Sequence, residues 1–296
     1  MKKYNINFVS KFPISIIVSL VLVLGSLTLF LTKGLNYGVD FKGGAEIQVK
    51  FESKIDMGML RSQLKDNFDS SSLQSIGDTD SNEFLIKVSG SEKNLNKVTD
   101  QITKMLTAKF AANNPDIQKT DIVGPKAGAE LRKSGFQALI WALLMIMIYI
   151  ALRFDYKYSP GAIVALIHDV VIIVGIFIVF DKEFSLQIVG ALLAVIGYSV
   201  NDTVVVFDRV REHEEKDVKR SLKDQINSAL NETLSRTILT SITTLIVAVI
   251  MFSMGGGVIH DFFFAISLGV VIGTYSSLFV AAPTIMFFDK FKGAKA

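Results

Sequence analysis

Four titratable residues lie in or beside stretches of this sequence that are otherwise apolar enough to cross a membrane. Asp202 interrupts one apolar run, His168 and Asp169 interrupt another, and Arg236 opens a third. Carboxylate, imidazole and guanidinium groups are the parts from which intramembrane proton relays are built. Because an ionisable group at the bilayer centre costs about 2.5–3.5 kcal/mol on insertion scales, each of these residues requires a reason. Their types point to movement of a proton or another small cation within a membrane.

The depths of these residues favour a shared role. Asp202 is about six residues, or roughly 9 Å, from one end of its apolar run. The His168–Asp169 pair follows Pro160 in a run that enters the membrane from the same side as that end. We predict that Asp202 carries the proton, that Arg236 holds it ionised until a proton arrives, and that His168 and Asp169 are weaker members. On a purely structural alternative, local water or a nearby cation simply solvates Asp202.

Six apolar stretches are long enough to position these groups in a bilayer. A helix needs about 20 residues to cross ~30 Å of hydrocarbon, and 50% of the 296 residues are hydrophobic. We therefore predict a polytopic α-helical membrane protein with six transmembrane helices, the first an uncleaved anchor. The spans are predicted approximately at 14–31, 136–152, 161–180, 184–207, 237–254 and 262–288.

Basic residues predict the orientation of the spans, because cytoplasmic loops carry an excess of Lys and Arg. One side of the membrane receives Lys2, Lys3, Lys11, Arg153, Lys157, Lys290, Lys292 and Lys295, together with the basic residues of Arg209–Lys223. The short loops of the other side hold only Lys182. Both termini and the loop 208–236 should thus be cytoplasmic.

A polar insert of roughly a hundred residues separates the first two spans, a length typical of a small domain. "AEIQVKF", "FLIKV" and "DIV" have strand patterns, whereas 57–68 and 95–106 place apolar residues at helical spacing. With "LQSI" as the weakest strand, the order β-α-β-β-α-β predicts a small α+β, ferredoxin-like domain outside the cytoplasm. The predicted divisions are 1–33 for the cytoplasmic N-terminus and first helix, 34–130 for this domain, and 131–296 for a five-helix transmembrane domain.

Small residues recur at every fourth position of the sixth span. Such a stripe marks close contact with another helix, of this chain or of a partner, because lipid offers helices no hydrophobic reason to associate. Its members are Ala265, Gly269, Gly273, Ser277 and Ala281, and Gly190 and Gly197 give the fourth span a shorter version.

Composition excludes several classes of function. The chain has no cysteine, which removes disulfides and thiol chemistry, and its net charge of +3 argues against binding nucleic acid. The sequence has no phosphate-binding G-x-x-x-x-G-K-[ST] loop, so ATP is not its energy source. We expect no enzyme activity, no metal and no cofactor other than a coupling ion, H⁺ or alternatively Na⁺.

Three long motifs resemble the SecF component of the bacterial SecDF protein-translocation accessory complex. They are "LNYGVDFKGGAEIQVKF", "IVGALLAVIGYSVNDTVVVFDRVRE" and "NETLSRTILTSITTLIVA". The resemblance implies half of a resistance-nodulation-division transporter architecture in the bacterial inner membrane. It also implies pairing with SecD, work beside the SecYEG channel on translocating preproteins, and use of the proton-motive force. The family's proton-conducting Asp and Arg fall on Asp202 and Arg236, flanked by Asn201 and Thr203, and a further carboxylate would belong to SecD.

Two other functions remain open at this stage. A half-size proton-coupled exporter of lipophilic small molecules would use the same intramembrane charges, but with an aromatic pocket in a larger outer domain. A membrane scaffold without transport would explain the small-residue stripe and leave the buried charges as an unexplained cost.

Overall fold

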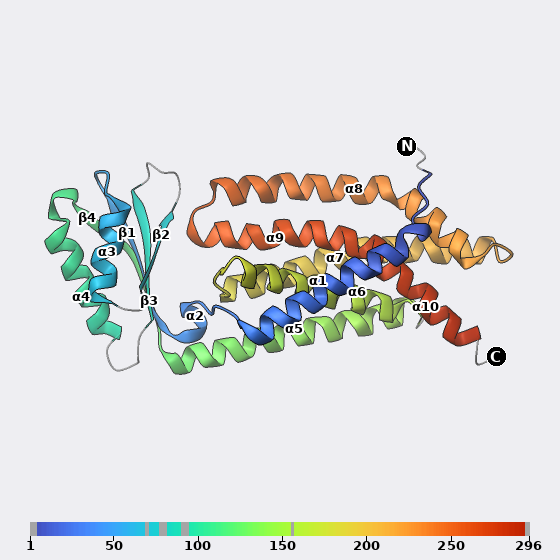
Figure 1. Ribbon diagram of the computed structural model, residues 1–296, viewed down its shortest axis with the longest axis horizontal. Coiled ribbons are helices and arrows are strands. Elements are labelled where there is room, and N and C mark those ends of the chain that lie inside the picture. The colour runs from blue at the N-terminus through green and yellow to red at the C-terminus, as the bar shows by residue number, and fades with distance from the viewer. Residues whose placement is uncertain (1–4, 69–70, 77–81, 90–94, 155–156, 294–296) are drawn as a thin grey trace.

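The computed structural model describes residues 5–68, 71–76, 82–89, 95–154 and 157–293, so Lys2, Lys3 and Lys295 lie outside the described residues. It consists of a bundle of long helices with a small α/β domain at one end (Figure 1). The start of α1 and the end of α10 lie at the opposite end of the bundle. The two parts are those that the hydropathy pattern predicts.

Within the described residues, six helices are long and apolar enough to cross a membrane, which confirms the predicted number. The sixth span is composite, with a π-helical segment at Ser277–Ala281 joining two α-helices. The α-helices of the bundle are α1 (Phe12–Thr32), α5 (Pro125–Arg153), α6 (Ser159–Val179), α7 (Leu186–Lys216), α8 (Leu222–Met254), α9 (Gly257–Ser276) and α10 (Ala282–Gly293).

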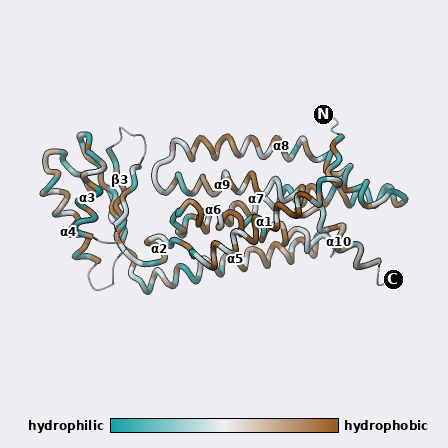
Figure 2. Tube along the Cα trace, in the orientation of Figure 1, coloured by the Kyte–Doolittle hydropathy of each residue, from teal (hydrophilic) through white to brown (hydrophobic). Residues whose placement is uncertain are grey.

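Several of these helices extend beyond the spans predicted for them. α5 begins at Pro125, which suits the first turn of a helix because proline has no N–H to leave unpaired. α8 begins at Leu222, after Ser221 accepts a hydrogen bond from the Asp224 N–H at 3.2 Å. Hydropathy detects only the part of a helix that crosses hydrocarbon, and Figure 2 shows hydrophobic residues along the middle of the bundle and polar residues at its ends.

The soluble domain has the predicted order of elements. An antiparallel sheet in the order β2-β3-β1-β4 is formed by β1 (Gly44–Phe51), β2 (Ser71–Ile76), β3 (Glu83–Ser89) and β4 (Pro115–Val123). The two helices of the domain are α3 (Met57–Asn67), between β1 and β2, and α4 (Leu95–Lys109), between β3 and β4. Ile47 and Val49 of β1 are fully buried with Leu60 of α3 and Ile102 of α4. The apolar residues that alternate along β1 therefore face the two helices, because successive side chains of a strand point to opposite faces of the sheet.

The chain enters this domain through a tight turn after the short helix α2 (Val39–Lys42). Gly43 has φ of 83°, and a Cβ there would lie 2.7 Å from the Pro125 backbone, so only glycine fits. Asp40 of α2 contacts the start of α7. Its Oδ2 accepts the N–H of Leu186 at 3.2 Å, because the first N–H groups of α7 have no partner within their own helix.

An ion pair joins the soluble domain to the bundle. Lys87 of β3 lies 2.6 Å from Glu183 in the loop before α7, and both side chains are mostly buried. Although burial lowers the pKa of Lys87, the charge and hydrogen bond of Glu183 raise it above its ordinary value. Burial raises the pKa of the neighbouring Glu46, with Lys87 opposing and Asp40 adding to the shift.

Replacing Glu46 with glutamine is therefore expected to stabilise the chain at neutral pH. A raised carboxyl pKa gives a favourable contribution that is complete below the ordinary value of 4.5 and is lost as the pH rises through the folded pKa. Glu46→Gln should raise the free energy of unfolding at pH 7 by about 0.5 kcal/mol, and much less at pH 4. Unfolding of the full chain in detergent would measure this, with the exposed Glu52→Gln as control. A loss of stability at pH 7 would contradict the prediction.

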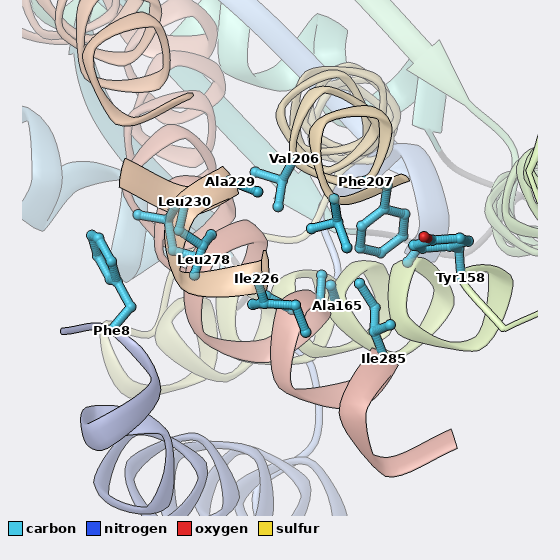
Figure 3. Packing of buried hydrophobic residues seen from close by; sticks show 14 of the residues in the cluster. Phe8, Tyr158, Ala165, Val206, Phe207, Ile226, Ala229, Leu230, Leu278 and Ile285 are labelled. Atoms are coloured by element: carbon cyan, nitrogen blue, oxygen red, sulfur yellow. The ribbon is translucent and has the colours of Figure 1, made fainter. Parts of the chain in front are cut away.

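The bundle packs around α7. Two buried apolar clusters lie along it, one around Val195 and Ile196 and the other around Val206 and Phe207. Figure 3 shows the second cluster, in which Phe207 lies beside Tyr158 and Val206 lies near Ala229. α7 therefore lies at the centre of the bundle, where its polar residues are forced into the interior.

Candidate functional site

The most buried carboxylate of the bundle is Asp169 on α6, and it joins three helices. Its side chain is 0% exposed. Ser199 of α7 donates to Oδ2 at 2.6 Å, Ser276 of α9 donates to the same oxygen at 2.8 Å, and Nδ1 of His168 lies 3.0 Å from Oδ1. Three hydrogen bonds meet the need of a buried charge for compensation.

The end of α9 places two adjacent serines against two different partners. Ser276 reaches Asp169, whereas Ser277, the first residue of the π-helical segment, lies 2.9 Å from the Thr203 hydroxyl. Ser277 itself donates to the Gly273 carbonyl at 2.9 Å, so Thr203 is the donor in their contact. A π-helical turn often occurs at functional sites because it changes the direction of side chains within a helix. Here it lies at the contact between α7 and the sixth span.

Asp202 is buried as well, but its surroundings differ. Its side chain is 3% exposed, and Oδ2 has no hydrogen-bond partner in the part of the chain that the structure describes. Arg236 on α8 is exposed, and its positive charge acts on the Asp202 carboxylate. Among the described ion pairs within 4.0 Å, none joins the two residues. Asp202 thus keeps an oxygen open within reach of a positive charge.

The predicted site residues therefore do not form a single cluster. His168 and Asp169 form one group, the charge of Arg236 on α8 acts on Asp202 of α7, and Thr203 contacts Ser277 of the π-helical segment. No hydrogen bond among the described residues links the two carboxylates directly. Asn201 is exposed.

Sequence reasoning missed Ser199 and Ser276 as partners of Asp169. Ser199 precedes Asp202 by three positions, so helical spacing puts both on one face of α7 and could have indicated it. Ser276 had no such signal, since it is 107 positions from Asp169 along the chain. Only the packing of α6 against α9 brings that pair together.

The small-residue stripe of the sixth span contacts α7 of the same chain. A Cβ on Gly269 would lie 2.1 Å from Cγ2 of Val195, and one on Gly273 would lie 3.0 Å from the Ser199 Cβ. Ala265 and Ala281 are fully buried, and Ser277 bonds to α7. The two glycines of α7 differ, since no described heavy atom lies within 4 Å of a Cβ built at Gly190 or Gly197. The stripe brings α9 close enough for its serines to reach the polar groups of α6 and α7.

Comparison with known proteins identifies relatives along nearly the whole chain. Residues 101–290 match the family model "Protein export membrane protein SecD/SecF, C-terminal", and residues 28–55 match the "SecD/SecF GG Motif". The protein translocase subunit SecF of Magnetococcus marinus is 40% identical over 98% of this chain and 94% of its own length. That of Pseudomonas aeruginosa is 35% identical over 96% and 92%, respectively.

A solved structure has the same fold. The crystal structure of SecDF, a translocon-associated membrane protein from Thermus thermophilus, aligns with a TM-score of 0.83 and 30% identity. The alignment covers 97% of this chain and 39% of the SecDF chain, so this chain corresponds to less than half of that protein. Six membrane-spanning helices, a glycine-glycine entry to a small antiparallel sheet, and these similarities give one conclusion: the chain is a multi-pass membrane protein of the SecD/SecF family, and within it a SecF.

Proposed function

We propose that this chain is a proton-motive-force-coupled accessory subunit that, together with SecD, assists preprotein export through the SecYEG channel. Its role is transport and not catalysis. The observation that supports this most directly is the pair of buried carboxylates, Asp169 and Asp202, at the contacts of the central helix α7. Burying a charge costs several kcal/mol unless it is paired and hydrogen-bonded, and Asp202 keeps an oxygen without a partner among the described residues, a cost that a scaffold function does not explain.

In this proposal Asp202 takes up and releases the proton. Its Oδ2 is buried without a partner among the described residues, so it can accept a proton without first breaking a bond. Arg236 favours the ionised carboxylate through its charge and makes no close ion pair with it in this structure. Protonation of Asp202 would cancel that attraction and alter how α7 lies against α8.

Asp169 and its partners would transmit this change to the sixth span. Ser199 and Thr203 lie on either side of Asp202 in α7. Ser199 bonds to Asp169, which also bonds to Ser276 of α9, and Thr203 bonds to Ser277 of the π-helical segment. A small rotation of α7 would strain both contacts together. Each proton moved across 100 mV supplies about 2.3 kcal/mol, so a few protons match the energy of several such bonds.

We also assign the chain to the bacterial inner membrane, with both termini and residues 208–236 in the cytoplasm and residues 34–130 in the periplasm. Residues 208–236 are not the predicted loop but the end of α7 and the start of α8 with a short connection. The excess of Lys and Arg in the short loops of one side supports this orientation, as does the position of the small α/β domain at the opposite end of the bundle from the start of α1 and the end of α10. The strand order β2-β3-β1-β4 with two helices supports a ferredoxin-like class for that domain. H⁺ is the proposed coupling ion, with no other cofactor.

The proposal is tested by separating the two possible ion gradients. Membrane vesicles would contain this chain, SecD and the channel, and late release of a preprotein would be measured. We expect stimulation by the chain to be lost when the proton gradient is collapsed while a sodium gradient is kept. Vesicles that lack only this chain give the unstimulated rate. Stimulation that persists on sodium alone would replace H⁺ by Na⁺, and release that never depends on the chain would contradict the proposed function.

A further inference from the structure

An apolar groove lies between α1, α6 and the end of the sixth span. It has a volume of about 550 Å³, within the range of pockets that hold small organic ligands. Its walls are formed by α1, by Val164, Ile167 and His168 of α6, and by residues of the sixth span that include Phe279, Pro283 and Thr284. Exposed apolar residues flank it, including Val164 at 45% and Ile167 at 46% exposure, so in a bilayer it faces hydrocarbon.

His168, one of the residues that line this groove, has a polar atom without a partner among the described residues. His168 is 4% exposed, and its Nε2 is buried with no hydrogen bond within the described chain. The other polar groups nearby are satisfied. Ser19 Oγ lies 3.0 Å from the Tyr275 hydroxyl, which in turn donates to the Ser15 carbonyl at 2.9 Å. Thr284 donates to the Val280 carbonyl at 2.6 Å. Since buried polar atoms are rarely left unpaired, a ligand group would supply the hydrogen-bond partner that His168 Nε2 lacks.

The hydrogen bonds of Asp169 determine what that group must be. Asp169 accepts from both serines at Oδ2, and an ionised carboxylate can only accept, so the His168 proton belongs on Nδ1, facing Oδ1. Nε2 of a neutral imidazole with that tautomer is an acceptor. The missing partner is therefore an O–H or N–H donor.

The depth of His168 excludes a phospholipid headgroup as this donor. Ser159 and His168 are nine positions apart on α6, about 14 Å at 1.5 Å per residue, which is close to the middle of a ~30 Å hydrocarbon layer. Headgroups stay at the surface of that layer. A donor at this depth must belong to a molecule that itself dissolves in the bilayer interior, and a charged molecule does not.

We propose that this groove binds an uncharged lipophilic alcohol or phenol, with its hydroxyl donating to His168 Nε2 and its hydrocarbon lying between α1 and α10. The inference is independent of the proposed export function. It rests on the unpaired Nε2 of His168, on the apolar walls of the groove and on the depth of His168 in the bilayer, and it does not depend on what the chain transports.

The test compares two photoreactive probes in membranes of cells that express the full chain. One probe is a long-chain alcohol with a diazirine in its chain, and the other is its methyl ether, which cannot donate. We expect the alcohol to label peptides of α1, α6 and α10 about tenfold more than the ether, because the ether leaves Nε2 unpaired. Equal labelling by both probes would mean that hydrocarbon alone fills the groove, which would overturn the proposal.

Variants locate the binding to this groove. Val164→Trp should fill it and remove the labelling by the alcohol, whereas Ile242→Trp, at a comparably exposed position on α8, should leave it unchanged. His168→Phe keeps a ring but removes the acceptor, so alcohol and ether should then label equally. Unchanged labelling of Val164→Trp would contradict the proposal. If that variant fails to accumulate, the comparison of the two probes on the unaltered chain still decides.

Discussion

Replacing Asp202 with asparagine is expected to abolish the gradient-driven part of preprotein release, because in the proposed function this carboxylate carries the proton. Asparagine has nearly the same shape and still forms hydrogen bonds, but it cannot gain or lose a charge at working pH. Each cycle then forfeits about 2.3 kcal/mol per proton per 100 mV, and release should fall to the rate of vesicles without the chain. The measurement is late-stage release in vesicles that also contain SecD and the channel.

Asp208→Asn is the matched control for this substitution. It changes the same chemical group on the same helix, but Asp208 lies in the polar end of α7 and pairs with Arg211 at 3.0 Å. Exposed pairs of this kind contribute little, so release should stay within the range of the unaltered chain. If Asp202→Asn keeps its stimulation while Asp169→Asn loses it, the carrier is Asp169 and our assignment is wrong.

Local patterns were sufficient to predict the elements of the fold. The lengths of the apolar runs predicted six spans, and alternation along Gly44–Phe51 predicted a half-buried strand, because burial imposes these periods directly on the sequence. The ends of α5, α7 and α8 could not be found in this way. Once a helix leaves hydrocarbon, its length depends on capping and on contacts with other elements, which hydropathy does not record.

The candidate site was predictable in its residues but not in its connections. A charge inside an apolar run is visible in any sequence, so Asp169 and Asp202 were found. Which of them has partners depends on how α6, α7 and α9 cross. Ser276 reaches Asp169 because α9 packs against α6, and the lack of a side chain at Gly269 and Gly273 lets α9 lie close to α7 as well. The sequence showed the stripe of small residues in the sixth span, and the structure shows that the stripe contacts α7.

The closeness of that approach makes Gly269→Ala a strongly destabilising substitution. An alanine Cβ would lie 2.1, 2.6 and 2.9 Å from Cγ2, Cγ1 and Cβ of Val195. Rotating the valine side chain cannot relieve the clash, because its Cβ is fixed to the backbone and is itself too close. The helices must separate, at a cost of about 1–3 kcal/mol, which exceeds the roughly 0.5–1 kcal/mol that alanine gains over glycine within a helix. Unfolding of the full chain in detergent measures the difference.

Two further variants connect this loss of stability to the α7–α9 contact. Gly190→Ala makes the same change in α7 at a position with no described heavy atom within 4 Å of the new Cβ, so it should be neutral or slightly stabilising. Val195→Ala removes both methyl groups that an alanine at position 269 would strike. It should therefore cost less stability in the Gly269→Ala background than in the unaltered chain, and a double-mutant cycle measures this coupling. If the two substitutions are additive, or if Gly269→Ala is as stable as Gly190→Ala, then α9 does not lie against α7 as closely as the positioning of Ser276 and Ser277 requires.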